Sequence, residues 1–132
     1  MEPSLIAYSK GFEMYGIADL LGRRAPILWS GMKRTYDFIP FEINGLVVSP
    51  SGGGVYVFSR RREYGDEALY VGETDDFQRR LKDELSHHHR WPCLKALGVT
   101  HVGIHLVPGA RSERLEIETD LRLGLDPPCN RQ

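Results

Sequence analysis

The sequence has few cysteines, no long apolar run and almost no net charge, and each shortage excludes a class of protein. Its 132 residues contain only Cys93 and Cys129, too few for a disulfide scaffold, so both are expected to be free thiols. The longest apolar stretches, 46–48 and 54–58, are far shorter than the roughly 18 residues of a membrane-spanning segment. A formal net charge of −1 argues against a uniformly basic nucleic-acid-binding surface.

The chain length and the first residues favour one intracellular domain. A chain of 132 residues can build one ordinary core but hardly two. The segment 1–4 begins with an acidic residue and lacks the basic and apolar regions of a secretory signal, which favours a cytoplasmic location. We expect residues 54–132 to form the core and residues 1–53 to form an extension packed on it.

The expected extension consists of a short helix and a hairpin. Apolar residues recur at helical spacing in 16–24, and the segment stops before Pro26. Two short apolar segments, 27–29 and 33–38, surround Ser30 and Gly31, an arrangement typical of a β-hairpin.

The core sequence alternates between strand and helix patterns. In 54–58, Val55 and Val57 should face one side of a strand while Tyr56 and Phe58 face the other. Further elements are expected at 68–72 (strand), 77–85 (helix), 100–107 (strand) and 112–124 (helix, capped by Ser112). This order predicts an α+β fold, with a small antiparallel three-stranded core sheet flanked by helices.

The last expected helix places one carboxylate at the edge of its apolar face. Glu118 lies beside the stripe formed by Ile117 and Leu121, whereas Glu116 and Asp120 point elsewhere. A carboxylate in this position requires a cation or hydrogen-bond donors. Glu118 therefore either pairs with Arg114, four residues earlier, or binds a metal ion.

Arg80 occupies a similar position in the preceding helix. It lies at the margin of the stripe that contains Phe77 and Leu81, so its guanidinium should emerge near the sheet. A guanidinium suits phosphate because its planar fork donates two hydrogen bonds and stays charged. The alternative is a surface salt bridge from Arg80 to Glu84.

Five elements in order give the chain a resemblance to the GIY-YIG nuclease family. They are Gly54-Val55-Tyr56, Tyr70-Val71-Gly72, Arg80, Glu118 and the terminal Pro128-Cys129-Asn130. The resemblance spans 54–130 and implies a metal-dependent endonuclease that hydrolyses phosphodiester bonds in nucleic acid, with DNA as the expected substrate. It also implies that Tyr56, Tyr70, Arg80, Glu118 and Asn130 are the catalytic residues.

By the same resemblance, Glu118 would hold one Mg²⁺ or Mn²⁺ ion. Either Tyr56 or Tyr70 would take a proton from the attacking water, and Arg80 would stabilise charge on the phosphoryl oxygens. A phenol with a pKa near 10 is a poor base at neutral pH, so a cation or Arg80 must favour its charged form.

Other residues are expected to contact the substrate, although the chain departs from the family pattern at two positions. The expected contacts are the glycine of the second motif, three basic side chains and one imidazole, namely Gly72, Arg60, Arg61, Lys82 and His88. Glu73 stands where many members have a lysine, and Glu84 where many have a tyrosine or histidine. An imidazole of 87–89 could replace the latter.

Two other interpretations remain open. Cys93, Cys129 and the histidines of 87–89 could form a zinc site, although their spacing is poor. The chain could also be a catalytically silent module that binds nucleic acid or a protein. Its near-zero net charge and the acidic Glu73 favour this interpretation. If the chain is a nuclease, its substrate specificity would come from the extension or from a protein partner.

Overall fold

The computed structural model describes residues 25–43 and 51–131, in which five strands precede and alternate with short helical segments. The strands are β2 (Ile27–Ser30), β3 (Thr35–Glu42), β4 (Gly54–Arg62), β5 (Gly65–Thr74) and β6 (His101–Leu106). The helical segments are η2 (Gln78–Asp83), η3 (Leu85–His87), α2 (Trp91–Ala96), α3 (Arg111–Leu125) and η4 (Pro128–Asn130). The expected helix at 16–24 lies outside the described residues.

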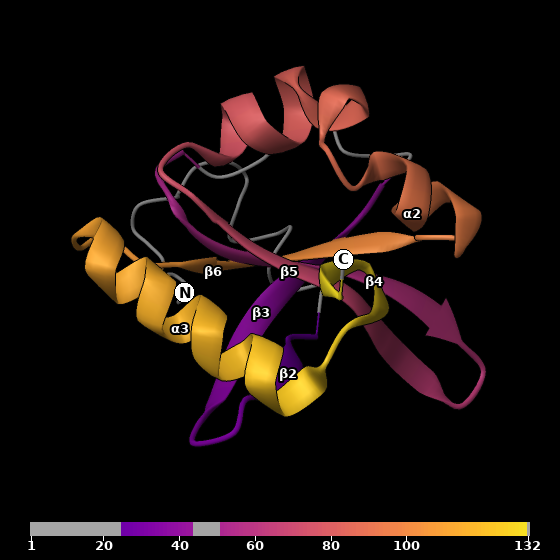
Figure 1. Cartoon of the computed structure of the whole chain (residues 1–132), viewed down its shortest axis with the longest axis horizontal. Helices are drawn as coiled ribbons and strands as arrows, with labels where there is room; N and C mark the ends of the chain where they lie inside the picture. The colour runs from indigo at the N-terminus through magenta and orange to yellow at the C-terminus, as the bar shows by residue number, and fades with distance from the viewer. Residues whose placement is uncertain (1–24, 44–50, 132) are drawn as a thin grey trace.

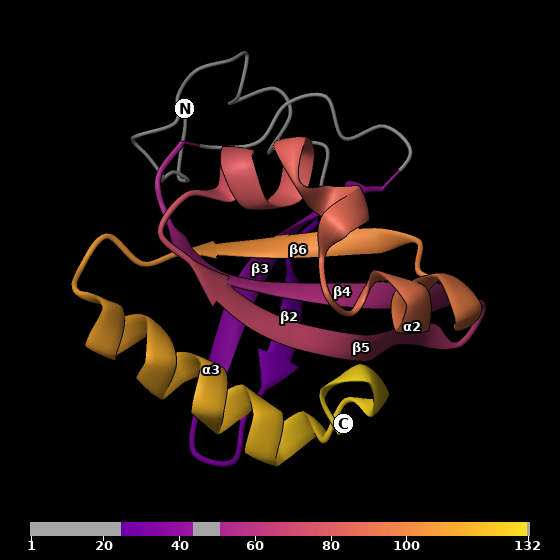
Figure 2. The same ribbon diagram turned by 45° about the horizontal axis from the view of Figure 1, so that its top comes forward.

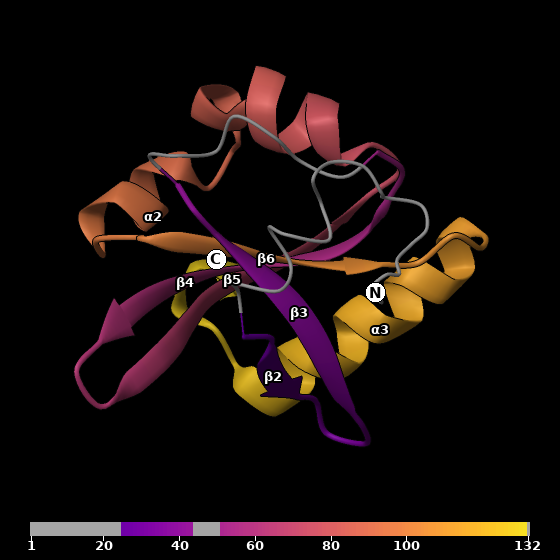
Figure 3. The same ribbon diagram turned by 180° about the vertical axis from the view of Figure 1, so that it is seen from behind.

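All five strands form one curled antiparallel sheet in the order β2-β3-β6-β4-β5 (Figure 1). The expected α+β fold with a three-stranded core sheet flanked by helices is therefore wrong, and the molecule is mainly a β-structure. The expected hairpin does form, but β3 pairs with β6, with Ile39 opposite Ile104, and so extends the sheet (Figure 3). The residue patterns identified the strands but carried no information about this pairing between distant segments.

Two apolar clusters cover the two faces of the sheet. Tyr56 and Phe58 belong to the cluster that η2 and α2 cover, while Val55 and Val57 belong to the cluster that α3 covers (Figure 2). The alternation expected for the first core strand is thus confirmed. It directs the motif tyrosine of β4 toward the helical segment that carries Arg80.

The segment after β5 is wound more loosely than the regular α-helix expected at 77–85. The backbone N–H of Glu84 donates to the carbonyl of Arg79 at 2.9 Å, five residues back, so η2 is a π-helix. A 3₁₀ turn and α2 follow it. In this segment the Glu84 side chain is half-exposed and His88 is buried.

The two cysteines are bonded to each other, so the expectation of free thiols is wrong. The Cys93–Cys129 disulfide joins α2 to η4 across 36 residues of sequence. Closing a loop of this length stabilises a protein by roughly 3–4 kcal/mol in the chain-entropy account. The bridge fixes the C-terminal segment against the helical layer that covers the tyrosines.

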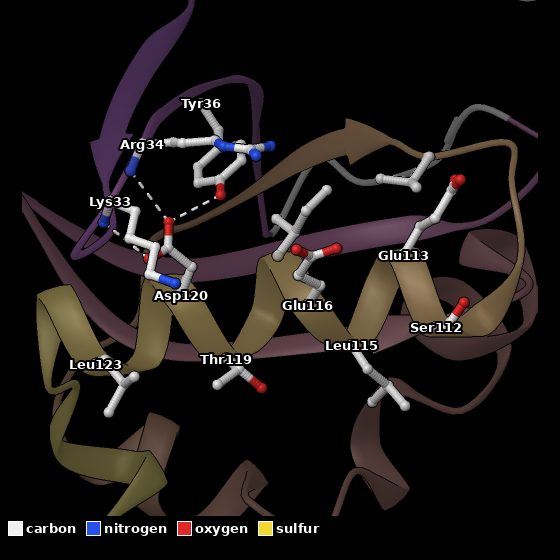
Figure 4. Close-up of a pocket in the computed structure, with 12 residues that line it drawn as sticks. Lys33, Arg34, Tyr36, Ser112, Glu113, Leu115, Glu116, Thr119, Asp120 and Leu123 are labelled. Carbon is white, nitrogen blue, oxygen red and sulfur yellow. Dashed lines mark hydrogen bonds between the residues drawn. The ribbon is translucent and has the colours of Figure 1, made fainter.

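The turn between β2 and β3 is anchored to α3 by a carboxylate expected to point elsewhere. Asp120 accepts hydrogen bonds from the backbone N–H groups of Lys33 (2.8 Å) and Arg34 (3.2 Å) and from the Tyr36 hydroxyl (2.8 Å) (Figure 4). These donors hold the pKa of Asp120 below its usual range although burial opposes them. Asp120 is therefore a structural residue.

The start of α3 also differs from the sequence expectation. The helix begins at Arg111 after Ala110, and no side chain caps it, so Ser112 lies inside its first turn.

Among the described residues, none of the helices is both long and apolar enough to cross a membrane.

Candidate functional site

The two motif tyrosines lie side by side on the face of the sheet that η2 covers. Tyr56 of β4 pairs across the strands with Gly72 of β5, and the ring centroids of Tyr56 and Tyr70 are 6.2 Å apart. Tyr56 is 1% exposed and Tyr70 is 8% exposed, so only the second ring reaches the surface. A side chain at Gly72 would collide with the first ring, since its Cβ would lie 2.5 Å from the Tyr56 oxygen.

His88 supplies an imidazole to the buried tyrosine. Its Nε2 lies 2.9 Å from Tyr56 Oη, while its Nδ1 accepts a hydrogen bond from the backbone N–H of Arg90 at 3.1 Å. Burial, followed by the charge of Arg80, lowers the pKa of His88 to about 3, so the ring is neutral. Because Nδ1 is the acceptor, the ring proton must lie on Nε2, which therefore donates to Tyr56.

Arg80 approaches the same phenol from η2. Its Nε–H lies 3.5 Å from Tyr56 Oη, and its Nη2 lies 3.4 Å from Nδ1 of His89. The His89 ring stacks on His88 with centroids 4.9 Å apart. The expected salt bridge from Arg80 to Glu84 is present only as a 4.0 Å contact, which leaves most of the guanidinium directed at the site.

The environment of the Tyr56 oxygen contains opposing influences. Burial raises the pKa of Tyr56 well above its ordinary value, whereas the hydrogen bond from Arg80 lowers it in part. Burial also raises the pKa of Tyr70, and the charge of Glu118 adds to this effect. Both phenols are therefore protonated in this structure, and the Tyr56 phenolate would need further positive charge.

Glu118 lies on α3 near enough to act electrostatically on both phenols. It is half-buried, and among the described residues it receives no hydrogen bond and forms no ion pair. Burial raises its pKa, the charges of Arg122 and Arg111 oppose the rise, and the neighbouring Glu73 adds to it. The structure does not show the expected alternative, a Glu118–Arg114 pair.

Arg114 instead binds Glu73, an ion pair that sequence reasoning did not find. Arg114 Nε donates to Glu73 Oε1 at 2.9 Å, and the two side chains are only 11% and 14% exposed. Arg111 makes a second contact with the other oxygen at 3.4 Å. No local signal could have shown this pair, because its members are 41 residues apart.

Asn130 holds the edge strand rather than facing the phenols. Its Oδ1 accepts from the backbone N–H of Val71 at 2.8 Å, and its Nδ2 donates to the carbonyl of Val71 at 3.0 Å. Val71 lies between Tyr70 and Gly72, so the terminal motif positions the second tyrosine. The expectation that Asn130 is catalytic stays a prediction, and the contacts of its amide in this structure are with the backbone of Val71.

The other cations expected to contact substrate are occupied or remote. Arg60 donates to Glu67 at 2.7 Å and to the Leu97 carbonyl at 2.8 Å, and Arg61 pairs with Asp66 at 2.9 Å. Arg60 lies four residues beyond Tyr56 along β4, or about 13 Å. Lys82 is exposed on η2.

A zinc site at the cysteines does not fit the structure. Both sulfurs belong to the disulfide, and His88 is engaged by Tyr56. Within 25–43 and 51–131, no three side chains of the histidine, cysteine and carboxylate types are grouped so as to hold a metal ion.

Comparison with known proteins leaves this site to be interpreted on its geometry alone. No family profile, curated protein or solved structure matches the chain. The functional argument therefore rests on two phenols, a neutral imidazole, a guanidinium and a carboxylate that has no hydrogen bond or ion pair within 25–43 and 51–131.

A Gly72→Ala substitution should disturb the site through packing. The added methyl must displace the Tyr56 ring and its bond to His88, at a cost of about 1–3 kcal/mol in unfolding free energy. Urea unfolding monitored by circular dichroism measures this cost. In a Tyr56→Ala background most of the collision is absent, so the penalty should shrink; an equal penalty in both backgrounds would contradict this packing account.

Proposed function

We propose that this chain is a metal-dependent endonuclease of the GIY-YIG family, which hydrolyses phosphodiester bonds in nucleic acid, with DNA as the preferred substrate. The single observation that carries this proposal is the meeting of Tyr56, His88 and Arg80 at one phenol oxygen, within electrostatic range of a carboxylate that has no hydrogen bond or ion pair among the described residues. A buried tyrosine needs a hydrogen-bond partner for its hydroxyl, but two donors converging on that oxygen would also stabilise a phenolate.

The donor set fits a hard divalent cation. Glu118 is half-buried, and burial raises its pKa in the absence of any described hydrogen bond or ion pair. Such a carboxylate is costly alone and becomes favourable when a cation balances it. One carboxylate with several waters is the coordination that Mg²⁺ and Mn²⁺ commonly adopt at phosphate sites.

In the proposed mechanism Tyr56 is the base that accepts a proton from the attacking water. The His88 N–H and the Arg80 Nε–H both donate to Oη and so stabilise the phenolate. When bound at Glu118, the cation supplies the positive charge that favours the phenolate and polarises the phosphoryl group. The Nη groups of Arg80 make only long contacts, at 3.4 Å with His89 and 4.0 Å with Glu84, and would turn to the charge growing on the phosphoryl oxygens.

Tyr70 is assigned the second role, orientation of the water or phosphate. It is the more exposed of the two phenols, and the described residues give its hydroxyl no hydrogen bond. The backbone of its neighbour Val71 is held by both polar atoms of the Asn130 amide. A fixed phenol with an available hydroxyl can direct a reactant at the surface of the site.

Cleavage of plasmid, branched and single-stranded DNA in the presence of Mn²⁺ or Mg²⁺ tests the proposal. We expect metal-dependent hydrolysis that EDTA abolishes, with branched DNA favoured because the small domain offers little surface for reading a long sequence. Binding without cleavage of any of these substrates would favour the silent binding module instead. The raised pKa of Tyr56 is the observation that favours this second function.

A further inference from the structure

A shallow pocket beside the proposed site contains an unusual concentration of guanidinium groups. The pocket has a volume of about 330 Å³ and is bordered by Arg79, Arg80, Arg111 and Arg114. Arg80 belongs to both the pocket and the phenol cluster, so the two are continuous. The pocket therefore adjoins the phenol cluster.

Three carboxylates also border the pocket, so its four arginines give it a net charge of +1. Glu73 is paired with Arg114 in a nearly buried contact of 2.9 Å. Asp75 is paired with Arg79 at 2.8 Å, and Glu84 lies 3.8 Å from Arg79. These pairs satisfy the carboxylates without requiring Arg111.

Arg111 is the guanidinium with the weakest engagement in this group. Its side chain is 69% exposed, and its contact with Glu73, at 3.4 Å, goes to a carboxylate that Arg114 already binds. An exposed contact of this kind contributes little and can be exchanged for a phosphate at small cost. Arg111 also lies within electrostatic range of Glu118, two turns further along α3, and lowers the pKa of that carboxyl slightly.

We propose that Arg111 binds a backbone phosphate of the nucleic acid next to the one that is cut, with Arg80 on the other side of the pocket. Glu73, which Arg114 holds in place, keeps Arg111 at the edge of the pocket through its second oxygen. This inference rests on the proposed nuclease function because it names how that site holds its substrate.

The test is the salt dependence of binding to a fluorescent DNA duplex in EDTA, where no cleavage occurs. Loss of one phosphate contact in Arg111→Ala should lower the slope of log affinity against log salt by roughly 0.9. Affinity should fall roughly 3- to 10-fold near 0.1 M salt. Arg111→Lys should restore the slope, since a point charge suffices for a phosphate contact.

Arg131→Ala is the matched control, because Arg131 is 59% exposed and likewise pairs with one carboxylate, Asp126, but lies outside the pocket. The control should keep the wild-type slope. Equal slopes for wild type and Arg111→Ala, or equal losses in both alanine variants, would overturn the proposal. Cleavage is assayed separately, so a changed slope without hydrolysis would retain this phosphate site and reject the nuclease. A wild type that binds no DNA would overturn both.

Discussion

Replacement of Glu118 by glutamine is expected to reduce cleavage roughly 1,000-fold, because the proposed cation would lose its only charged ligand. Folding should not suffer. The described residues give Glu118 no hydrogen bond or ion pair, and burial raises its pKa, so a neutral amide relieves a desolvation cost. Initial rates of plasmid nicking at saturating Mn²⁺ measure the loss, and thermal unfolding should show an unchanged or raised Tm.

Glu116→Gln is the matched control for this substitution. It removes the same charge from the same helix at an exposed position that faces a different pocket. The control should cleave at the wild-type rate. Equal rates for both glutamine variants would remove Glu118 from the mechanism.

Replacement of Tyr56 by phenylalanine is the second substitution with a large expected effect. The ring packing stays, but the oxygen that accepts from His88 and Arg80 disappears, so the rate should fall roughly 100- to 10,000-fold. The buried His88 N–H loses its acceptor, which should cost about 1–3 kcal/mol of unfolding free energy. Single-turnover cleavage and urea unfolding of the same variant separate the two effects.

Tyr64→Phe provides the comparison, since Tyr64 is 80% exposed in the loop that joins β4 and β5. It should change neither the rate nor the stability. If Tyr56→Phe cleaved DNA at the wild-type rate while losing stability, Tyr56 would be a packing residue and the assignment of the base would move to Tyr70.

Local patterns predicted the strands and the two faces of β4, but not the arrangement of the strands. The alternation in 54–58 correctly separated Tyr56 from Val55, because strand periodicity is a property of adjacent residues. The pairing of β3 with β6 joins Ile39 to Ile104, and nothing near either residue records it. The three-stranded sheet was wrong for this reason.

The site shows the same division between local and distant information. Arg80 was expected to emerge near the sheet, and it does reach Tyr56. The π-helical turn was not predicted, whereas an imidazole of 87–89 had been suggested in place of Glu84, and His88 is the one that contacts Tyr56. Likewise the Cys93–Cys129 bond and the Glu73–Arg114 pair depend on contacts between residues 36 and 41 positions apart.

The central claim is that the Glu118 carboxylate holds a divalent cation beside the phenols, and Mn²⁺ binding followed by electron paramagnetic resonance tests it most directly. The account predicts one bound Mn²⁺ per chain in the presence of DNA in the slow Tyr56→Phe protein. That ion should be lost when Glu118→Gln is added and retained when Glu116→Gln is added. Equal Mn²⁺ binding by the two double variants would contradict the account.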